Sequence, residues 1–274
     1  MIDNYSHYVN TVLYTEASIP GPMDNTKECL ELFNNFNSQI MLHCSCKTVC
    51  RFHTCACLQK SGGFNYISYE ESGKIKYLLN IGIEELPLYM ECNDMCTCGA
   101  QCGNRLVQKG PVDGLYVKPC KIMNKGLGLY TSSFLLKGTF VCEYAGELLT
   151  KSQAIARYKN NLLNGMSNYI FCLNEYSNGN ALQTFVDPSH FGNIGRYINH
   201  SCNPNCQVIP VRWNSPIPKL AIFVSLDVAP GTELTFNYGA HSNHSKKLGL
   251  TTKLVKCLCN SPNCDGYMPY DYYN

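Results

Sequence analysis

The chain has 274 residues, of which 45% are apolar and only 15% are charged, and its formal net charge is +2. This composition excludes a disordered chain, and the small net charge argues against a dedicated nucleic-acid-binding domain, which usually carries a strong basic excess. The outlying feature is the count of 18 cysteines, because incidental core packing uses far fewer.

Two kinds of site explain so many cysteines: disulfides in a secreted protein, or zinc bound by thiolates in a reducing compartment. The first residues, Met1 to His7, contain neither a basic nor an apolar run, so no signal peptide is expected. The longest apolar stretches, such as Leu220–Leu226, are too short to span a bilayer, so no membrane partner is expected. The sequence therefore favours zinc.

The predicted elements begin with a helix over Lys27–Phe36, where Cys29, Phe33 and Phe36 have helical spacing. Residues 60–91 are an insertion rich in glycine and tyrosine. From Gly110 to Tyr238 short β-type runs alternate with turn signals, and Lys151–Leu163 is predicted to be a helix. The predicted strands are Leu115–Pro119, Thr139–Tyr144, Tyr169–Leu173, Thr184–Val186, Gln207–Val211, Leu220–Ser225 and Glu233–Phe236. The expected fold class is a β-dominated α+β fold.

The distribution of cysteines divides the chain. We predict an N-terminal segment over residues 1–40, a zinc-cluster module over 41–106 and a β-rich domain over 110–239. A polar and basic linker, 240–252, then leads to a second zinc module over 253–269.

The first module holds nine closely spaced cysteines: Cys44, Cys46, Cys50, Cys55, Cys57, Cys92, Cys96, Cys98 and Cys102. Nine thiolates do not divide into tetrahedral sites of four. If three sulfurs each bridge two metals, however, nine cysteines give four ligands to each of three zinc ions. Two separate zinc sites with a spare cysteine, or disulfides, are the alternatives. The cluster is expected to be structural, since it has no open position and few other residues to form a core.

The second module offers three ligands, Cys257, Cys259 and Cys264. A structural zinc needs a fourth ligand, and Cys202 is the best candidate in the sequence. A fourth zinc ion bound in this way would fold the C-terminal segment back onto the β-rich domain.

Four motifs lie between the cysteine modules: Lys125-Gly126-Leu127-Gly128-Leu129, Glu143-Tyr144-Ala145-Gly146-Glu147, Arg196-Tyr197-Ile198-Asn199-His200-Ser201-Cys202 and Glu233-Leu234-Thr235-Phe236-Asn237-Tyr238. With the cysteine arrays, over roughly residues 40–269, they resemble the SET-domain histone-lysine N-methyltransferases that carry pre-SET and post-SET modules, in particular the histone H3 lysine-9 group. The segments Phe185–Pro188, Gly192–Arg196 and Ile209–Arg212 resemble the subgroup fused to a mariner transposase. The resemblance implies a SET-domain fold of small curved β-sheets. In it the Asn199–Cys202 segment forms a pseudoknot beside Tyr238.

The resemblance also implies S-adenosylmethionine as cofactor. The residues implied to contact it are Lys125, Gly126, Leu127, Gly128, Tyr169, Arg196, Asn199, His200, Tyr238 and Leu258. Gly126 and Gly128 would let the backbone approach the cofactor, whereas Arg196 is expected mainly to support the pseudoknot. Leu127 replaces the tryptophan usual in the family, and Leu258 is placed to supply apolar cover. The competing interpretations are an ordinary glycine turn and, for His200 and Tyr238, packing in the core.

The implied catalytic residues are Tyr238, Tyr169 and Phe236. An aromatic channel beside a sulfonium would lower the pKa of a target lysine from about 10.4 and favour its neutral, nucleophilic amine. Phenylalanine at position 236 leaves more room than tyrosine, so di- or trimethylation is expected.

The expected partners are a histone H3 tail and chromatin, and the expected location is the chromosome in the nucleus. Lysine 9 of histone H3 is the favoured target, and lysine 36 or a lysine of a non-histone protein is the alternative. No direct sequence-specific nucleic-acid binding is expected. The alternatives are a catalytically weak SET protein that acts as a chromatin-binding scaffold, and a zinc-cluster nucleic-acid binder.

Overall fold

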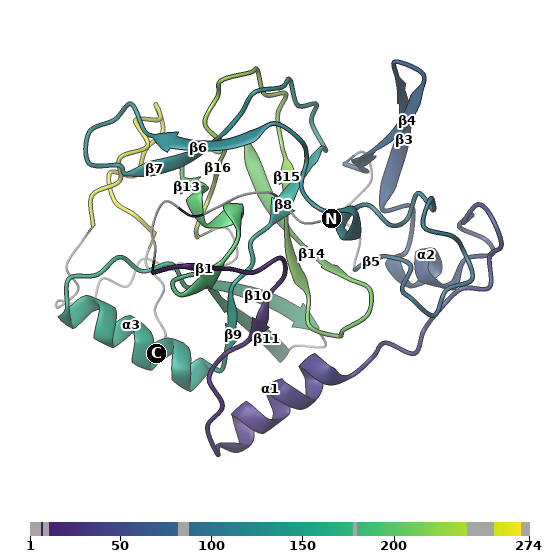
Figure 1. The fold of residues 1–274 in the computed structure, drawn as a ribbon, viewed down its shortest axis with the longest axis horizontal. Coiled ribbons are helices and arrows are strands. Elements are labelled where there is room, and N and C mark those ends of the chain that lie inside the picture. Colours follow the sequence, from purple (N-terminus) through teal and green to yellow (C-terminus); the bar gives the residue numbers. More distant parts are fainter. Residues whose placement is uncertain (1–6, 8–10, 82–87, 178–179, 240–254, 270–274) are drawn as a thin grey trace.

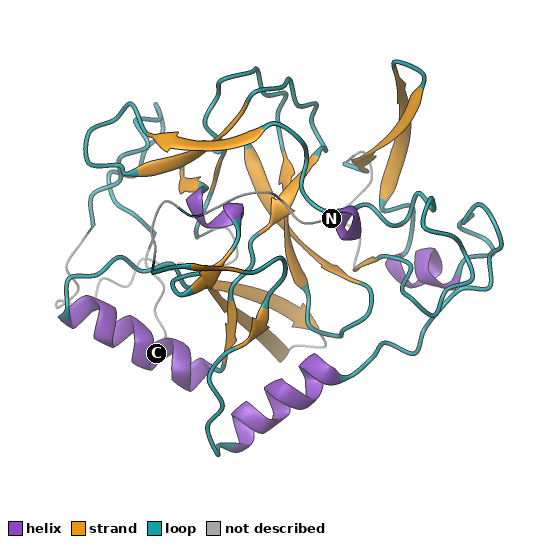
Figure 2. Ribbon diagram, in the orientation of Figure 1, coloured by secondary structure: helices purple, strands orange, loops and turns teal. Residues whose placement is uncertain are grey.

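The computed structural model describes residue 7 and residues 11–81, 88–177, 180–239 and 255–269. Short strands in several small sheets dominate these residues, with helices at the periphery (Figures 1 and 2). The helices are α1 (Lys27–Asn37), α2 (Ala56–Ser61) and α3 (Lys151–Leu163), with 3-10 turns η1 (Val107–Lys109) and η2 (Ile194–Tyr197). This architecture confirms the β-dominated α+β fold. None of the described helices is long and apolar enough to cross a membrane.

Two four-stranded sheets form the centre of the fold. The first has the order β5 (Tyr89–Met90), β14 (Cys206–Arg212), β15 (Lys219–Val224) and β8 (Phe140–Glu143). The second has the order β10 (Phe171–Ser177), β11 (Asn180–Asp187), β9 (Glu147–Leu149) and β2 (Ile19–Pro20).

The remaining strands pair two by two. They are β1 (Leu13–Tyr14) with β12 (Phe191–Gly192), β3 (Tyr66–Glu71) with β4 (Lys74–Leu79), β6 (Leu115–Pro119) with β7 (Leu127–Thr131), and β13 (Asn199–His200) with β16 (Thr235–Phe236). The β3–β4 hairpin projects from the body of the molecule (Figure 1).

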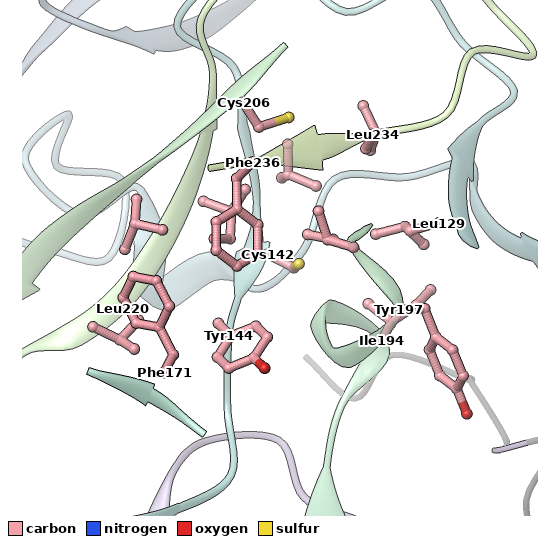
Figure 3. Close-up of a cluster of buried hydrophobic side chains, with 14 of the residues drawn as sticks. Leu129, Cys142, Tyr144, Phe171, Ile194, Tyr197, Cys206, Leu220, Leu234 and Phe236 are labelled. Atoms are coloured by element: carbon pink, nitrogen blue, oxygen red, sulfur yellow. The ribbon is translucent and has the colours of Figure 1, made fainter. Parts of the chain in front are cut away.

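The largest apolar core lies where β8, β10, β15 and η2 meet. Its side chains include Phe236, Phe171 and Tyr144, whose rings lie close together in Figure 3. The ring centroids of Phe171 and Phe236 are 5.6 Å apart with an edge-on geometry, which is a favoured arrangement of aromatic pairs. The rings of Tyr144, Phe171 and Phe236 therefore form an aromatic wall in this core.

The parallel pairing of β13 with β16 places Asn199 opposite Thr235 and His200 opposite Phe236. The third and fourth of the four sequence motifs thus become neighbours although they are far apart in the chain. This is the juxtaposition of His200 with Tyr238 that the resemblance implies.

Strand β5 joins the cysteine-rich region to the first sheet, since Tyr89 pairs with Val211 and Met90 with Arg212. The next residue, Glu91, is fully buried. Its carboxylate accepts hydrogen bonds from the amides of Leu106 and Val107 and from Tyr66 Oη, each of 2.7 Å. Buried carboxylates require such donors, so Glu91 fixes β3, β5 and η1 to one another.

Helix α3 begins with a capping box, in which Thr150 Oγ1 accepts from the Gln153 amide and the Gln153 side chain accepts from the Thr150 amide. Only Ala154 of α3 is buried, so apolar packing holds this helix weakly. Polar contacts also hold it, among them the Arg157 guanidinium, which donates to Glu147 at 2.6 and 3.1 Å and to Asp187 at 2.8 Å.

The sequence prediction is exact for α3 and for β6, and the helix at Lys27 extends one residue further than expected. The strand expected from Tyr169 begins instead at Phe171. The Tyr169 carbonyl accepts a hydrogen bond from Tyr144 Oη at 2.6 Å, and the Ile170 amide donates to Asn168 Oδ1, so neither group is available to pair with a strand. Of the run Glu233–Phe236 only the last two residues are in β16. The proposed linker, 240–252, lies outside the described residues.

The Arg157 network yields a test of stability. The side chains of Glu147 and Asp187 are 6% and 1% exposed, so Arg157→Met would leave two buried carboxylates without a cation. We expect the free energy of unfolding in urea to fall by about 3 kcal/mol. The control is Lys27→Met, which removes an exposed pair with Glu31 and should have no measurable effect. Equal effects of the two substitutions would contradict this account.

Candidate active site

The nine cysteines of the first module lie together around one centre. Sulfur–sulfur distances include 3.5 Å for Cys50–Cys102, 3.7 Å for Cys50–Cys92 and 3.8 Å for Cys44–Cys98. Sulfurs at the corners of a zinc tetrahedron with bonds of about 2.3 Å are about 3.8 Å apart, whereas a disulfide is about 2.05 Å long. All 18 cysteines carry free thiols, so the disulfide alternative is wrong and the donor set fits zinc.

The sulfurs of this module fall into overlapping groups of four that all lie within 4.8 Å of one another. Cys44 and Cys92 each belong to three of these groups. A sulfur can share several groups only if it lies between them, which is the position of a bridging ligand. The nine sulfurs therefore form one continuous group of donors that is compatible with zinc.

The C-terminal module forms a separate group of four sulfurs, from Cys202, Cys257, Cys259 and Cys264. Cys202 Sγ lies 3.9 Å from the sulfurs of both Cys257 and Cys264. Since Cys202 follows β13, a metal at this site would tie the C-terminal segment to the centre of the β-rich domain. The structure therefore brings together the four residues that the spacing indicated.

The glycine motif begins β7, and its geometry demands glycine. Gly126 has a φ of +80°, and a Cβ on Gly128 would lie 2.8 Å from Cys120 Sγ and 3.0 Å from Glu233 Oε1. The positive φ of Gly126 strains any other residue, and a side chain at position 128 would force Cys120 and Glu233 to move. Asn199 Nδ2 donates to the Leu127 carbonyl at 3.0 Å, so β13 is anchored directly to this motif.

Glu233 is a site residue to which the sequence analysis assigned no role. Its carboxylate accepts from Lys125 Nζ at 2.7 and 2.8 Å and from Asn199 Nδ2 at 2.9 Å. It thus fixes two of the predicted cofactor-contacting side chains at once. The available signal was that Glu233 is the only acidic residue of the motif ending in Tyr238.

A cavity of about 410 Å³ adjoins the aromatic wall. The three predicted catalytic residues, Tyr169, Phe236 and Tyr238, all line it, together with Tyr144 and Phe171. Phe236 is 1% exposed, and its ring centroid lies 4.9 Å from that of Tyr238. Among the described lining residues none is charged. This environment disfavours a cationic amine and favours a neutral one.

Tyr238 is held at both its backbone and its side chain. Its hydroxyl donates to the Ile198 carbonyl at 2.8 Å, and its amide donates to His200 Nδ1 at 3.2 Å. Burial raises the pKa of Tyr238 well above its ordinary value, so the hydroxyl stays protonated at neutral pH. Because its hydrogen is directed to Ile198, the oxygen keeps its lone pairs for a neighbouring donor.

His200 is buried, and burial lowers its pKa to about 4. The imidazole is therefore neutral, and because Nδ1 accepts from Tyr238, the proton is on Nε2. Nε2 lies 3.4 Å from Cys202 Sγ. His200 is therefore a bridge between the predicted catalytic tyrosine and the C-terminal cysteine group.

Two predicted contacts occupy less central positions. Arg196 Nε donates to the Pro188 carbonyl at 3.1 Å, and its guanidinium lies 4.6 Å from the ring centroid of Tyr169, which is the supporting position expected for it. Leu258 is half-buried in the C-terminal module and is not among the described residues that line the cavity.

The C-terminal cysteine group makes a prediction about metal content. We expect Cys202→Ser to lose one zinc ion per chain, because the remaining three sulfurs cannot complete a tetrahedron. Elemental analysis of purified protein measures the stoichiometry. Cys29→Ser is the matched control, since Cys29 belongs to none of the sulfur groups; an unchanged zinc content in Cys202→Ser would refute the assignment.

Comparison with known families matches the SET domain over residues 126–239 and the Pre-SET motif over residues 3–105. The chain is 40% identical to the histone-lysine N-methyltransferase SETMAR of Bos taurus over 239 residues, which cover 83% of this chain and 74% of the relative.

Solved structures agree. The crystal structure of the methyltransferase domain of human SETMAR superposes with a TM-score of 0.74 at 33% identity, over 99% of this chain and 93% of that one. KRYPTONITE in complex with mCHH DNA, an H3(1–15) peptide and SAH superposes with a TM-score of 0.70 at 25% identity, over 94% of this chain and 48% of that one. The shared fold, the Pre-SET and SET matches and the identity to SETMAR together show that this chain belongs to the SET-domain histone-lysine N-methyltransferases.

Proposed function

We propose that this enzyme transfers methyl groups from S-adenosylmethionine to a lysine of histone H3, with lysine 9 the first candidate and lysine 36 or a non-histone lysine the others. The observation that carries the proposal is the uncharged aromatic cavity that Tyr169, Phe236 and Tyr238 line. The KRYPTONITE complex, which contains both an H3 peptide and SAH, supports the choice of partner and cofactor. Action on chromatin in the nucleus follows from this substrate.

The cofactor site proposed here surrounds β7 and β13. Lys125, Gly126, Leu127 and Gly128 would supply the backbone surface, and Asn199 and His200 would supply polar contacts. Tyr169 and Tyr238 would separate cofactor from lysine, because both line the cavity. When bound, S-adenosylmethionine supplies a methyl group on a cationic sulfonium.

The chain's own contribution to the reaction is to orient and desolvate the nucleophile. Tyr169, Phe236 and Tyr238 exclude water from the lysine side chain and favour its neutral amine. The lone pairs of Tyr238 Oη can accept a hydrogen bond from this amine, since the hydroxyl hydrogen is already donated to Ile198. Holding the amine in line with the methyl group supplies most of the acceleration.

We also propose three zinc ions in the nine-cysteine cluster and a fourth at Cys202, Cys257, Cys259 and Cys264. All four would be structural. The module boundaries proposed from the sequence, with pre-SET at 41–106, SET at 110–239 and post-SET at 253–269, are retained as part of this proposal.

The function is tested by mass spectrometry of histone H3 incubated with zinc-replete enzyme and S-adenosylmethionine. We expect methylation by the wild-type chain and about a hundredfold lower kcat for Tyr238→Phe, because the substitution removes the oxygen that orients the amine. Circular dichroism should show that this variant keeps the wild-type fold. Full activity of Tyr238→Phe would refute its assignment.

The same experiment separates the enzyme from a scaffold. Leu127, where the family has tryptophan, is the feature that favours a catalytically weak protein. If zinc-replete wild-type protein binds no S-adenosylmethionine and methylates nothing, the proposed enzyme function is overturned and the scaffold is the alternative that is left.

Phe236 yields a prediction about product level. Its ring is packed against Tyr144, Phe171 and Tyr238 at centroid distances of 5.8, 5.6 and 4.9 Å, and it carries no hydroxyl to occupy the space beside the amine. We expect wild-type enzyme to give di- or trimethyl-lysine and Phe236→Tyr to stop at monomethyl-lysine. Intact-mass spectra of a peptide product measure the distribution, and an identical distribution for both proteins would contradict the role of Phe236.

A further inference from the structure

The zinc cluster proposed for the nine cysteines would carry a net negative charge. Nine thiolates bring nine negative charges and three zinc ions bring six positive ones, so three negative charges remain. Eight of the nine cysteines are buried, and buried charge is stable only beside charge of the opposite sign. A cation inside the module, in contact with the sulfurs, is therefore expected.

Arg105 has the position of such a cation. It is 8% exposed, whereas every other lysine and arginine among the described residues of 41–106 is exposed. Its Nη2 donates to the Asn93 carbonyl at 2.8 Å and to the Cys98 carbonyl at 3.3 Å, and it lies 3.8 Å from Cys98 Sγ. The guanidinium is thus held against one corner of the sulfur array.

No carboxylate of the described residues forms an ion pair with Arg105. Gln108 separates it from Glu91, because Arg105 Nη1 donates to Gln108 Oε1 at 2.9 Å and Gln108 Nε2 donates to Glu91 Oε2 at 2.7 Å. The buried Nε of Arg105 has no hydrogen-bond acceptor in the described part of the chain. Since a buried arginine without an anion is costly, the sulfurs are the anions that compensate for its charge.

Other sulfurs of the cluster receive hydrogen bonds from neutral donors. The Asn93 amide donates to Cys96 Sγ at 3.3 Å, and Asn104 Nδ2 donates to Cys92 Sγ at 3.5 Å. These dipoles orient the sulfurs, but they leave the net charge of the cluster unchanged. Arg105 differs from them because it brings a full positive charge, which arginine keeps at any pH at which the protein is folded.

We propose that Arg105 is the charge-compensating residue of the zinc cluster, and that its guanidinium sets how firmly the cluster retains zinc. This inference rests on the proposed three-zinc cluster and is independent of the proposed methyl transfer. Residues that contact the ligands of a metal without binding it change metal affinity by about ten- to a hundredfold when they are substituted.

The test uses the full zinc-replete chain and measures zinc itself. Pyridylazoresorcinol, a chromogenic chelator, competes for the metal in wild type, Arg105→Met and Arg51→Met, and elemental analysis gives the starting zinc content. We expect the apparent zinc affinity of the cluster to be about tenfold lower in Arg105→Met than in wild type. Arg51→Met is the matched control, because it removes the same charge from an exposed side chain of the same module and should behave as wild type.

Two further measurements separate the charge of Arg105 from its packing. Arg105→Lys keeps the positive charge, so it should retain zinc more firmly than Arg105→Met. In cobalt-substituted protein, a nearby cation lowers the energy of the sulfur lone pairs. The thiolate-to-cobalt charge-transfer band should therefore move to lower energy in Arg105→Met and stay at the wild-type position in Arg105→Lys and Arg51→Met. A purely structural role of Arg105 would not move this band.

Wild-type zinc affinity in Arg105→Met would overturn the inference, and so would equal losses in Arg105→Met and Arg105→Lys with an unmoved cobalt band. If Arg105→Met does not fold, Arg105→Lys decides: zinc affinity and a band like those of Arg51→Met support the role of charge, and a loss of about tenfold overturns it. A wild-type chain that holds a single zinc ion would overturn the proposed cluster together with this inference. Absence of methylation alone would overturn the proposed enzyme function and leave the role of Arg105 standing.

Discussion

The site depends on one connection, the attachment of the C-terminal segment to the strand that carries Asn199 and His200. Cys202 supplies it, since its sulfur meets those of Cys257, Cys259 and Cys264 only two residues beyond His200. His200 in turn accepts from the Tyr238 amide. The C-terminal sulfur group, the predicted catalytic tyrosine and the cavity-lining residues Val255 and Met268 are consequently linked through Cys202 and His200.

Charge is divided between the two ends of the site. At the glycine motif, Lys125 and Glu233 form an ion pair that also holds Asn199, so this end can match the charged groups of an amino-acid-like cofactor. At the aromatic end the described lining has no charge, and a lysine amine is disfavoured as a cation. The proposed reaction needs the charged end and the uncharged aromatic end side by side. The β13–β16 pairing provides this, because it places Asn199 and His200 next to Thr235 and Phe236.

Much of the fold and of the candidate site could be predicted from the sequence, because the residue patterns that indicate them are local in the chain. Cysteine spacing indicated both sulfur groups, and the capping residue Thr150 precedes a helix whose bounds were predicted exactly. The role of Glu233 could not be predicted, because its partners Lys125 and Asn199 become neighbours only in the fold. The hairpin of β3 and β4 could not be predicted from the sequence, since its alternation of polar and apolar residues is weak and most of it is exposed. Tyr169 was misplaced in a strand because the bond from Tyr144 that occupies its carbonyl is a tertiary contact.

The pairing of β5 with β14 has a consequence for how the chain folds. Val211 and Arg212 would form an open sheet edge if the cysteine-rich module were removed, and open edges promote aggregation. Within that module, Glu91 lies one residue beyond β5 and accepts hydrogen bonds from Tyr66, Leu106 and Val107, so the strand that covers this edge is itself held by buried polar contacts. The cysteine-rich module therefore supplies, through β5, the neighbour strand that covers the edge of β14 in the catalytic domain.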